Sequence, residues 1–305
     1  MKEDIFYISP TTDFGFKKCF GDELVMKSFL EALFAYQGKV LIIKKLTFLN
    51  KEMDGYTRDS RRIIYDVKCE TETGEIFIVE MQNGEQSFFE RRIMYYMARS
   101  IASQGLLSPS DKRKTAKGQT VKREKWSYDI KRVVGVFLMN YIVTDERHKV
   151  SRNCIVDVST QEISSDLFEY WKIQLPFYSG DVLKPEDCKT DLDCWLYNII
   201  NMKTMNKVMP FTNRSAGLSR LSQIASFHNM SLADQELYLK EYDTEVVYRD
   251  VQKTAAAKNR AEGRAEGEHS KAISIATNMI KHGDDIDYII SVTGLTREEV
   301  AGIKC

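Results

Sequence analysis

The feature that most constrains the fold is a hairpin pattern between Tyr65 and Gln82, YDVKCETETGEIFIVEMQ. Two alternating, β-branched runs flank a short polar stretch that contains a glycine, which is typical of antiparallel strands joined by a tight turn. A three-residue turn, Glu72-Thr73-Gly74, with the glycine in the left-handed conformation, makes Thr71 face Glu75. This register fixes which side chains share a face of the sheet.

Counting back along both strands places Asp66 opposite Glu80, with Gln82 on the same face. Carboxylates at facing positions lie about 5 Å apart and repel by roughly 3 kcal/mol at an effective dielectric of 20. A divalent cation bound between the two carboxylates replaces this repulsion by attraction. Mg²⁺ takes oxygen ligands from one or two carboxylates and keeps positions for water and phosphate. Two alternatives stay open. A two-residue turn would put the carboxylates on opposite faces, or both could simply lie where the strands reach solvent.

The rest of the first 180 residues predicts a mixed α/β domain. Helical spacing and a capped start predict one or two helices between Ser9 and Gly38, and residues 39–52 are either a strand or a continuation. A helix over 87–104 follows the hairpin directly. Apolar, β-branched runs predict further strands within 130–143, 153–159 and 170–178.

Beyond residue 180 the pattern becomes helical. We expect a helical extension over 181–245, with a break near 208–217, and a third region over 246–305. This last region contains a long polar helix over 247–283, in which Gly263 and Gly267 each cost roughly 1 kcal/mol relative to alanine. Two short helices follow, the first ending at Gly294 and the second capped by Thr296. The polar helix is a candidate for self-association into a homo-oligomer.

Composition excludes several classes of protein. Lys plus Arg and Asp plus Glu both number 44, so no whole-chain basic field points to nucleic acid. The most apolar run, Val133 to Val143, is about half a membrane span, and the first residues lack the apolar core of a secretory signal. The six cysteines are scattered without CxxC spacing, which favours reduced thiols over disulfides or zinc ligands. We therefore expect a soluble, cytoplasmic protein without a membrane partner.

Several motifs in order resemble the Rpn family of recombination-promoting nucleases and transposases, within the PD-(D/E)xK nuclease superfamily. They are TDFGFKKCFGDE near the start, the hairpin, the helix ERRIMYYMARSIASQG, and the final VTGLTREEV. The resemblance covers most of the chain. It implies a restriction-endonuclease-like core, with a central mixed sheet flanked by helices, followed by a helical C-terminal region.

The resemblance also implies a metal-dependent DNA endonuclease. Asp66, Glu80 and the backbone carbonyl of Met81 would hold Mg²⁺, with Mn²⁺ as a substitute. Gln82 occupies the place of the superfamily's lysine. An amide can orient a water molecule, but it carries no positive charge and transfers no proton. Asp66, Glu80 and Gln82 are thus the candidate catalytic residues, and Lys68, on the face of Asp66, is either a substitute cation or a solvated lysine.

Candidate substrate contacts lie on the helices and on one basic loop. Asp13 is either a further catalytic acid or the cap of the first helix, and Lys17 lies one turn later. Arg92 and Tyr96 are four residues apart, so they can grip a phosphate from one helix face, or else belong to the surface and the core. The loop from Leu106 to Trp126 carries most of the local positive charge and is either a DNA backbone contact or a solvated loop; its candidate contacts are Lys112, Arg113, Lys114, Lys117, Lys122 and Arg123.

The sequence leads to three hypotheses for the function. The first is a metal-dependent DNA endonuclease that hydrolyses phosphodiester bonds and promotes recombination or transposition. The second is a nuclease-fold protein that binds DNA with weak or no turnover, because Gln82 replaces lysine. The third is a non-catalytic interaction protein that acts through its helical C-terminal region.

Overall fold

The computed structural model describes residues 7–50, 52–53, 63–106, 128–143 and 148–303. The chain divides into two compact units, Met1–Leu239 and Lys240–Cys305. Among the described residues, no helix has the length and apolar character needed to cross a membrane.

The first unit is built on a mixed six-stranded sheet in the order β1-β4-β5-β6-β8-β7. The outer pairs β1 with β4 and β7 with β8, and the hairpin β4 with β5, are antiparallel, whereas β5, β6 and β8 run parallel. The strands are β1 (Leu46–Phe48), β4 (Val67–Thr71), β5 (Ile76–Gln82), β6 (Val133–Met139), β7 (Val150–Val156) and β8 (Ile163–Gln174). A separate short pair joins β2 (Glu52–Met53) to β3 (Ile63–Ile64).

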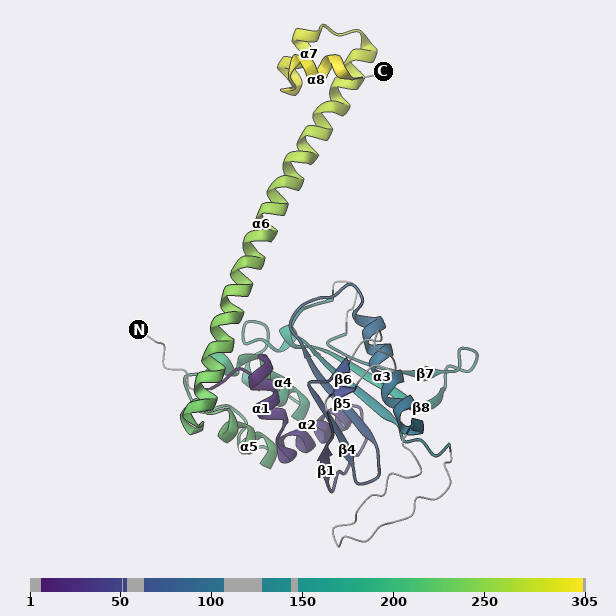
Figure 1. Cartoon of the computed structure of the whole chain (residues 1–305), viewed down its shortest axis with the longest axis vertical. Coiled ribbons are helices and arrows are strands. Elements are labelled where there is room, and N and C mark those ends of the chain that lie inside the picture. Colours follow the sequence, from purple (N-terminus) through teal and green to yellow (C-terminus); the bar gives the residue numbers. More distant parts are fainter. Residues whose placement is uncertain (1–6, 51, 54–62, 107–127, 144–147, 304–305) are drawn as a thin grey trace. The chain divides into compact units, whose positions relative to one another are not determined.

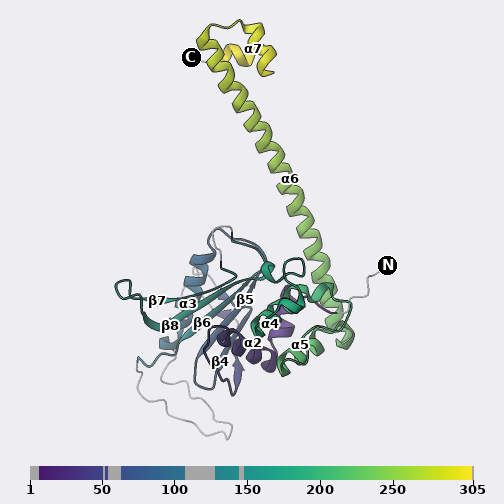
Figure 2. The ribbon, with the colours of Figure 1, turned by 180° about the vertical axis from the view of Figure 1, so that it is seen from behind.

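Helices cover both faces of this sheet (Figure 1). One face packs against α1 (Asp13–Phe20), α2 (Glu23–Ala35), α4 (Asp191–Asn201) and α5 (Ala216–Ala225) around the larger core, which contains Trp171 and Trp195. The other face packs against α3 (Phe89–Leu106), which inserts Phe89, Ile93 and Met97 among the side chains of β5 and β6. Figure 2 shows the same layering from behind. A mixed sheet between helical layers is the architecture that the sequence predicted.

The predicted hairpin register is confirmed. Thr71 and Glu75 close the turn through the Thr71 N–H and the Glu75 carbonyl (2.9 Å), and Gly74 adopts a φ of 88°. From there the strands pair in the expected register, down to Val67 opposite Val79. Asp66 and Glu80 are the next pair in that register.

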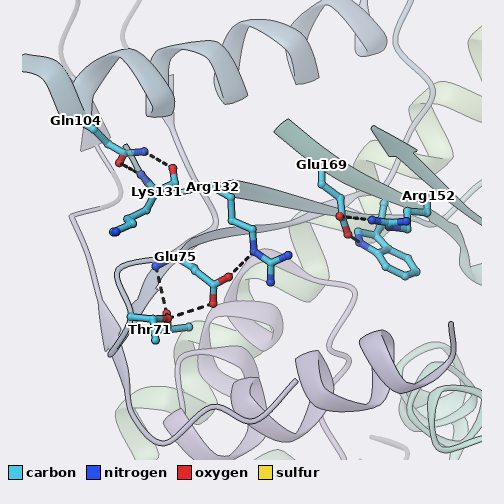
Figure 3. A network of polar contacts seen from close by, with 9 residues as sticks. Thr71, Glu75, Gln104, Lys131, Arg132, Arg152 and Glu169 are labelled. Atoms are coloured by element: carbon cyan, nitrogen blue, oxygen red, sulfur yellow. Dashed lines mark hydrogen bonds and ion pairs between the residues drawn. The ribbon is translucent and has the colours of Figure 1, made fainter. Parts of the chain in front are cut away.

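The amino ends of β5 and β6 are fixed by polar contacts, drawn in Figure 3. Gln104 at the end of α3 binds both the N–H and the C=O of Lys131 (2.8 Å each), directly before β6. Arg132 forms an ion pair with Glu75 at the start of β5. These contacts lie at the end of β5 that is opposite to Glu80 and Gln82, so they hold the scaffold without occupying the candidate site.

Several predicted elements have different bounds in the structure. In residues 39–50, only Leu46–Phe48 form a strand. The strand predicted over 170–178 ends at Gln174, and Leu175–Tyr178 form a 3₁₀ turn, because Pro176 has no N–H for a ladder. The interruption expected near 208–217 separates α4 from α5, which begins at Ala216.

The long polar helix begins earlier than its polar sequence indicates. The helix α6 (Leu232–His282) starts within the first unit, where Tyr238 is buried in the larger core and its hydroxyl accepts a bond from the Ser9 N–H (3.0 Å). The helix continues through Gly263 and Gly267, which are both exposed as expected.

The second unit has a small core of its own, which includes Ala276, Ile289, Leu295 and Val300. The last turns of α6 contribute to it together with α7 (Ile286–Thr293) and α8 (Arg297–Gly302). The predicted boundaries of the two short helices are confirmed, because Gly294 ends α7 at a φ of 71° and Thr296 caps α8 within a capping box.

Candidate active site

The candidate site lies where the hairpin loses its pairing at the carboxyl end of β5. Thr71 and Glu75 form a hydrogen-bonded pair, so alternation makes Asp66 and Glu80 a non-hydrogen-bonded pair, in which side chains approach more closely. The strand β4 begins only at Val67. One step further along, the Met81 N–H donates to Asp66 Oδ2 at 2.9 Å. A side chain thus takes the place of a backbone acceptor at this point.

Glu80 is a buried carboxyl group on β5, and no ion pair joins it to a lysine, arginine or histidine within the described part of the chain. Its side chain is 6% exposed, and its Oε1 atom is buried without a hydrogen-bond partner among the described residues. Burial, reinforced by the negative charge of Asp66, raises the pKa of Glu80 to about 8, and the charge of Arg92 partly opposes this. The alternative that Glu80 simply marks the point where the strand reaches solvent is therefore wrong.

Asp66 is half-buried and responds to charges from several elements. Burial raises the pKa of its carboxyl group, while the hydrogen bond from the Met81 N–H lowers it. The charge of Asp13 also raises that pKa, and the charges of Lys17 and Arg92 lower it. Asp66 directly precedes β4, which is not an edge strand, since β1 pairs with it at Cys69–Thr71.

Gln82 is held at both ends of its amide. Its Nε2 donates to the Gly84 carbonyl (2.7 Å), and its Oε1 accepts from the Arg92 guanidinium. Arg92 also donates to Gln86 Oε1 (2.6 Å) and stacks over the rings of Phe89 and Tyr96, at 5.4 and 5.7 Å from their centroids. The guanidinium from α3 is therefore fixed beside the candidate catalytic strand.

Tyr96 is half-buried rather than either fully core or fully exposed. Its ring packs edge-on against Tyr65 (5.5 Å between centroids), and its backbone carbonyl accepts from the Tyr65 hydroxyl (3.2 Å). Arg92 and Tyr96 do share one face of α3, as their spacing predicts, and the stacking contact joins them. Whether they contact a substrate stays a prediction.

Lys68 is not a solvated lysine. It is 7% exposed, and its amine lies 5.1 Å from the centroid of the Tyr65 ring. Burial lowers the pKa of the amine. Lys68 faces Ile78, one alternate position from Glu80, so it lies on the site face but deeper toward the hairpin turn.

The first helix approaches the same region. Thr12, not Asp13, caps α1, since the Thr12 hydroxyl accepts from the Gly15 N–H (3.0 Å). The cap role predicted for Asp13 is therefore wrong, and its carboxylate instead forms an ion pair with Lys17 (2.5 Å). The residues that fasten this helix to the strand end include Asn83, whose amide donates to the Thr11 carbonyl (2.7 Å).

Asn83 was not among the predicted site residues. It directly follows Gln82 and also accepts from the Asn140 amide (3.1 Å), one residue after β6. The signal in the sequence is the polar run EMQN at the end of an apolar strand. The predicted contacts Lys112, Arg113, Lys114, Lys117, Lys122 and Arg123 lie outside the described residues.

The described residues contain no group of three or more His, Cys, Asp or Glu side chains that could hold a metal ion. A cation at this site would therefore rely on the carboxylate pair. The arrangement fits such a cation, because Glu80 Oε1 is a buried oxygen without a partner among the described residues, and the burial and the Asp66 charge that hold the proton on Glu80 are what a bound cation would offset. The five cysteines among the described residues are free thiols, and no two of them have CxxC spacing.

Comparison with protein families gives one match that spans most of the chain. The model of the PD-(D/E)XK nuclease family transposase matches residues 10–256, which include the whole sheet and every described candidate residue. No curated protein and no solved structure shows a significant match.

Proposed function

Because the chain belongs to the PD-(D/E)XK nuclease family transposases, we propose that it is a metal-dependent DNA endonuclease that hydrolyses phosphodiester bonds and so promotes recombination or transposition. The observation that carries the proposal is the buried Glu80 carboxyl group, whose Oε1 has no partner among the described residues and which lies opposite Asp66 when the hairpin register is continued by one pair beyond Val67 and Val79. A hairpin selected only for stability has no use for this pair.

The carboxylates of Asp66 and Glu80 would hold the cation, with the Met81 carbonyl as a third ligand. In an extended strand the N–H and C=O of one residue point to the same side, and the Met81 N–H points to Asp66. Bound Mg²⁺ or Mn²⁺ supplies a Lewis acid for the scissile phosphate and lowers the pKa of a water molecule.

The remaining roles belong to residues of β5 and α3. Gln82 holds the Arg92 guanidinium beside the acidic pair, and that guanidinium offers a fork for a phosphate of the DNA. We assign the positive charge that Gln82 lacks to Arg92 rather than to Lys68, whose amine is buried over Tyr65. Asp13 and Lys17 form an ion pair and partly neutralise each other. Their role is to adjust the pKa of Asp66, which the Asp13 charge raises and the Lys17 charge lowers.

The test is digestion of supercoiled plasmid by the full chain with Mg²⁺ or Mn²⁺, compared with EDTA. Asp66→Asn and Glu80→Gln keep shape but remove charge, so each is expected to abolish cleavage. Glu70→Gln is the matched control, since it makes the same chemical change on β4 outside the site. Cleavage that persists in both site variants refutes the assignment.

A second function is favoured by Gln82 itself, because both ends of its amide are already engaged. In that case the protein binds DNA without turnover. Wild-type protein that binds DNA but leaves plasmid intact with either metal, at enzyme in excess over DNA, supports this second function over the first.

A further inference from the structure

A ridge of α3 exposes aromatic rings next to the candidate site. Phe88, directly before the helix, is 67% exposed, and Tyr95 is 40% exposed. The Phe88 carbonyl accepts from the Arg92 N–H (2.9 Å), so Phe88 belongs to the first helical turn. We call Phe88, Arg91 and Tyr95 the α3 ridge, since their spacing places them along one side of the helix.

Packing of α3 does not explain these rings. The helix is anchored to the sheet by Phe89, Ile93 and Met97, which are all buried. The ridge residues belong to neither hydrophobic cluster of the first unit. A phenylalanine ring left in water gains none of the stabilisation that burial would give, so the ridge is a candidate contact surface.

Positive charge lies along the same ridge. The Arg91 guanidinium carbon is 5.7 Å from the centroid of the Phe88 ring, and the neighbouring Arg92 reaches Gln82 in the candidate site. Glu90, the acidic residue that precedes Arg91, is paired with Lys172 of β8 (2.8 Å). Rings that alternate with guanidinium groups match a polymer in which flat bases alternate with phosphates.

We propose that the α3 ridge stacks unpaired bases, so that the substrate is DNA with a single-stranded or frayed segment beside the cleavage point. The identification of DNA rests on the proposed function. Phe88 and Tyr95 lie about 10 Å apart along the helix axis at 1.5 Å per residue, enough to contact more than one base of a single strand. In a continuous duplex each base face is covered by its neighbours, which leaves no π-face for these rings.

Binding in EDTA tests the ridge without cleavage. Fluorescence anisotropy of the full chain would compare an oligo-dT strand, a splayed fork and a blunt duplex. Phe88→Ala and Tyr95→Ala are each expected to weaken binding of the strand and the fork by about 5-fold or more, and of the duplex by less than about 2-fold. Phe88→Trp should retain binding, and Met94→Ala is the matched control, because Met94 is an exposed apolar residue about 100° around α3 from the Tyr95 ring.

Salt dependence separates stacking from charge. Arg91→Ala should reduce the slope of log K against log salt for the single strand by about 0.7, the value for one phosphate contact. Phe88→Ala should lower affinity at every salt concentration without changing the slope. Equal losses on all three DNAs, unchanged binding in Phe88→Ala, or a wild-type protein that does not bind the strand would each overturn the proposal.

The two proposals fail in different ways. If plasmid is cleaved with Mg²⁺ but Phe88→Ala binds every DNA like the wild type, the ridge assignment is wrong and the nuclease remains. If Phe88→Ala loses strand binding while no metal supports cleavage, the ridge stands as a binding surface and the nuclease proposal fails.

Discussion

The charge state of Glu80 makes the stability of the metal-free protein depend on pH in a defined direction. In the unfolded chain Glu80 loses its proton near its ordinary pKa of 4.5, whereas in the folded protein it keeps the proton up to about pH 8. Between these values the folded state holds more protons than the unfolded state. The free energy of unfolding must therefore fall as the pH rises through this window.

The magnitude follows from the two pKa values. The difference between 4.5 and about 8, at 1.36 kcal/mol for each pKa unit, corresponds to ~5 kcal/mol at pH above 8. Glu80→Gln removes the titration while keeping the shape of the side chain. We expect the variant to be more stable than the wild type by up to ~5 kcal/mol at pH 8.5, with little difference at pH 4.5.

Urea denaturation in EDTA at the two pH values provides the measurement. Tryptophan fluorescence is a suitable probe, because Trp171 and Trp195 are buried in the core of the first unit. A Glu80→Gln variant that is less stable than the wild type at pH 8.5, or a difference that does not change with pH, refutes the reasoning.

Glu169 provides a matched control, because its pKa is shifted in the opposite direction to that of Glu80. This second buried glutamate accepts from Arg152 (2.6 Å) and from Trp171 Nε1 (2.9 Å). Burial alone would raise the pKa of Glu169, but the Arg152 and Trp171 contacts hold it below its usual value. Glu169→Gln should therefore destabilise the protein at neutral pH, and the difference should shrink as the pH falls through the acidic range.

Further predictions concern packing and the site. Arg152→Ala should cost about 3–5 kcal/mol of stability by urea denaturation, because it leaves the buried Glu169 charge unpaired. Gly217→Ala should strongly lower the melting temperature, since its Cβ would lie 2.2 Å from the Ser28 Cβ where α2 and α5 meet, and Ser28→Gly should restore part of the loss. Mg²⁺ at about 100 times its Kd should raise wild-type stability by about 2.7 kcal/mol at pH 8 and leave Glu80→Gln nearly unchanged, as calorimetry can measure.

The hairpin was predictable because its information is local. Turn length and Gly74 fix the register, and alternation then decides which side chains share a face. The helix ends at Gly294 and Thr296 follow from capping preferences for the same reason. Of the two alternatives for Asp13, only the cap was wrong, since either Thr12 or Asp13 can cap a helix and only the backbone geometry decides between them.

Other features depend on contacts between distant segments. Burial of Lys68 results from the packing of α3 over Tyr65, which no pattern within the hairpin encodes. The bond between Arg92 and Gln82 needs α3 to return across the sheet, so sequence spacing identified both residues but not their contact. The core contact of Tyr238 explains in the same way why α6 begins before its polar stretch.

The candidate site is formed by the way in which strand pairing ends at the open end of the hairpin. Continued pairing would place Tyr65 opposite Met81 in a hydrogen-bonded pair, yet β4 begins only at Val67 and the Asp66 carboxylate takes the Met81 N–H instead. On its other side β5 stays paired with β6 as far as Gln82. The strand is thus held rigidly from one side while its free side faces carboxylate oxygens. Burial of these groups is unfavourable in the folded chain alone, so we infer that this local instability is retained because a cation and a phosphate offset it together.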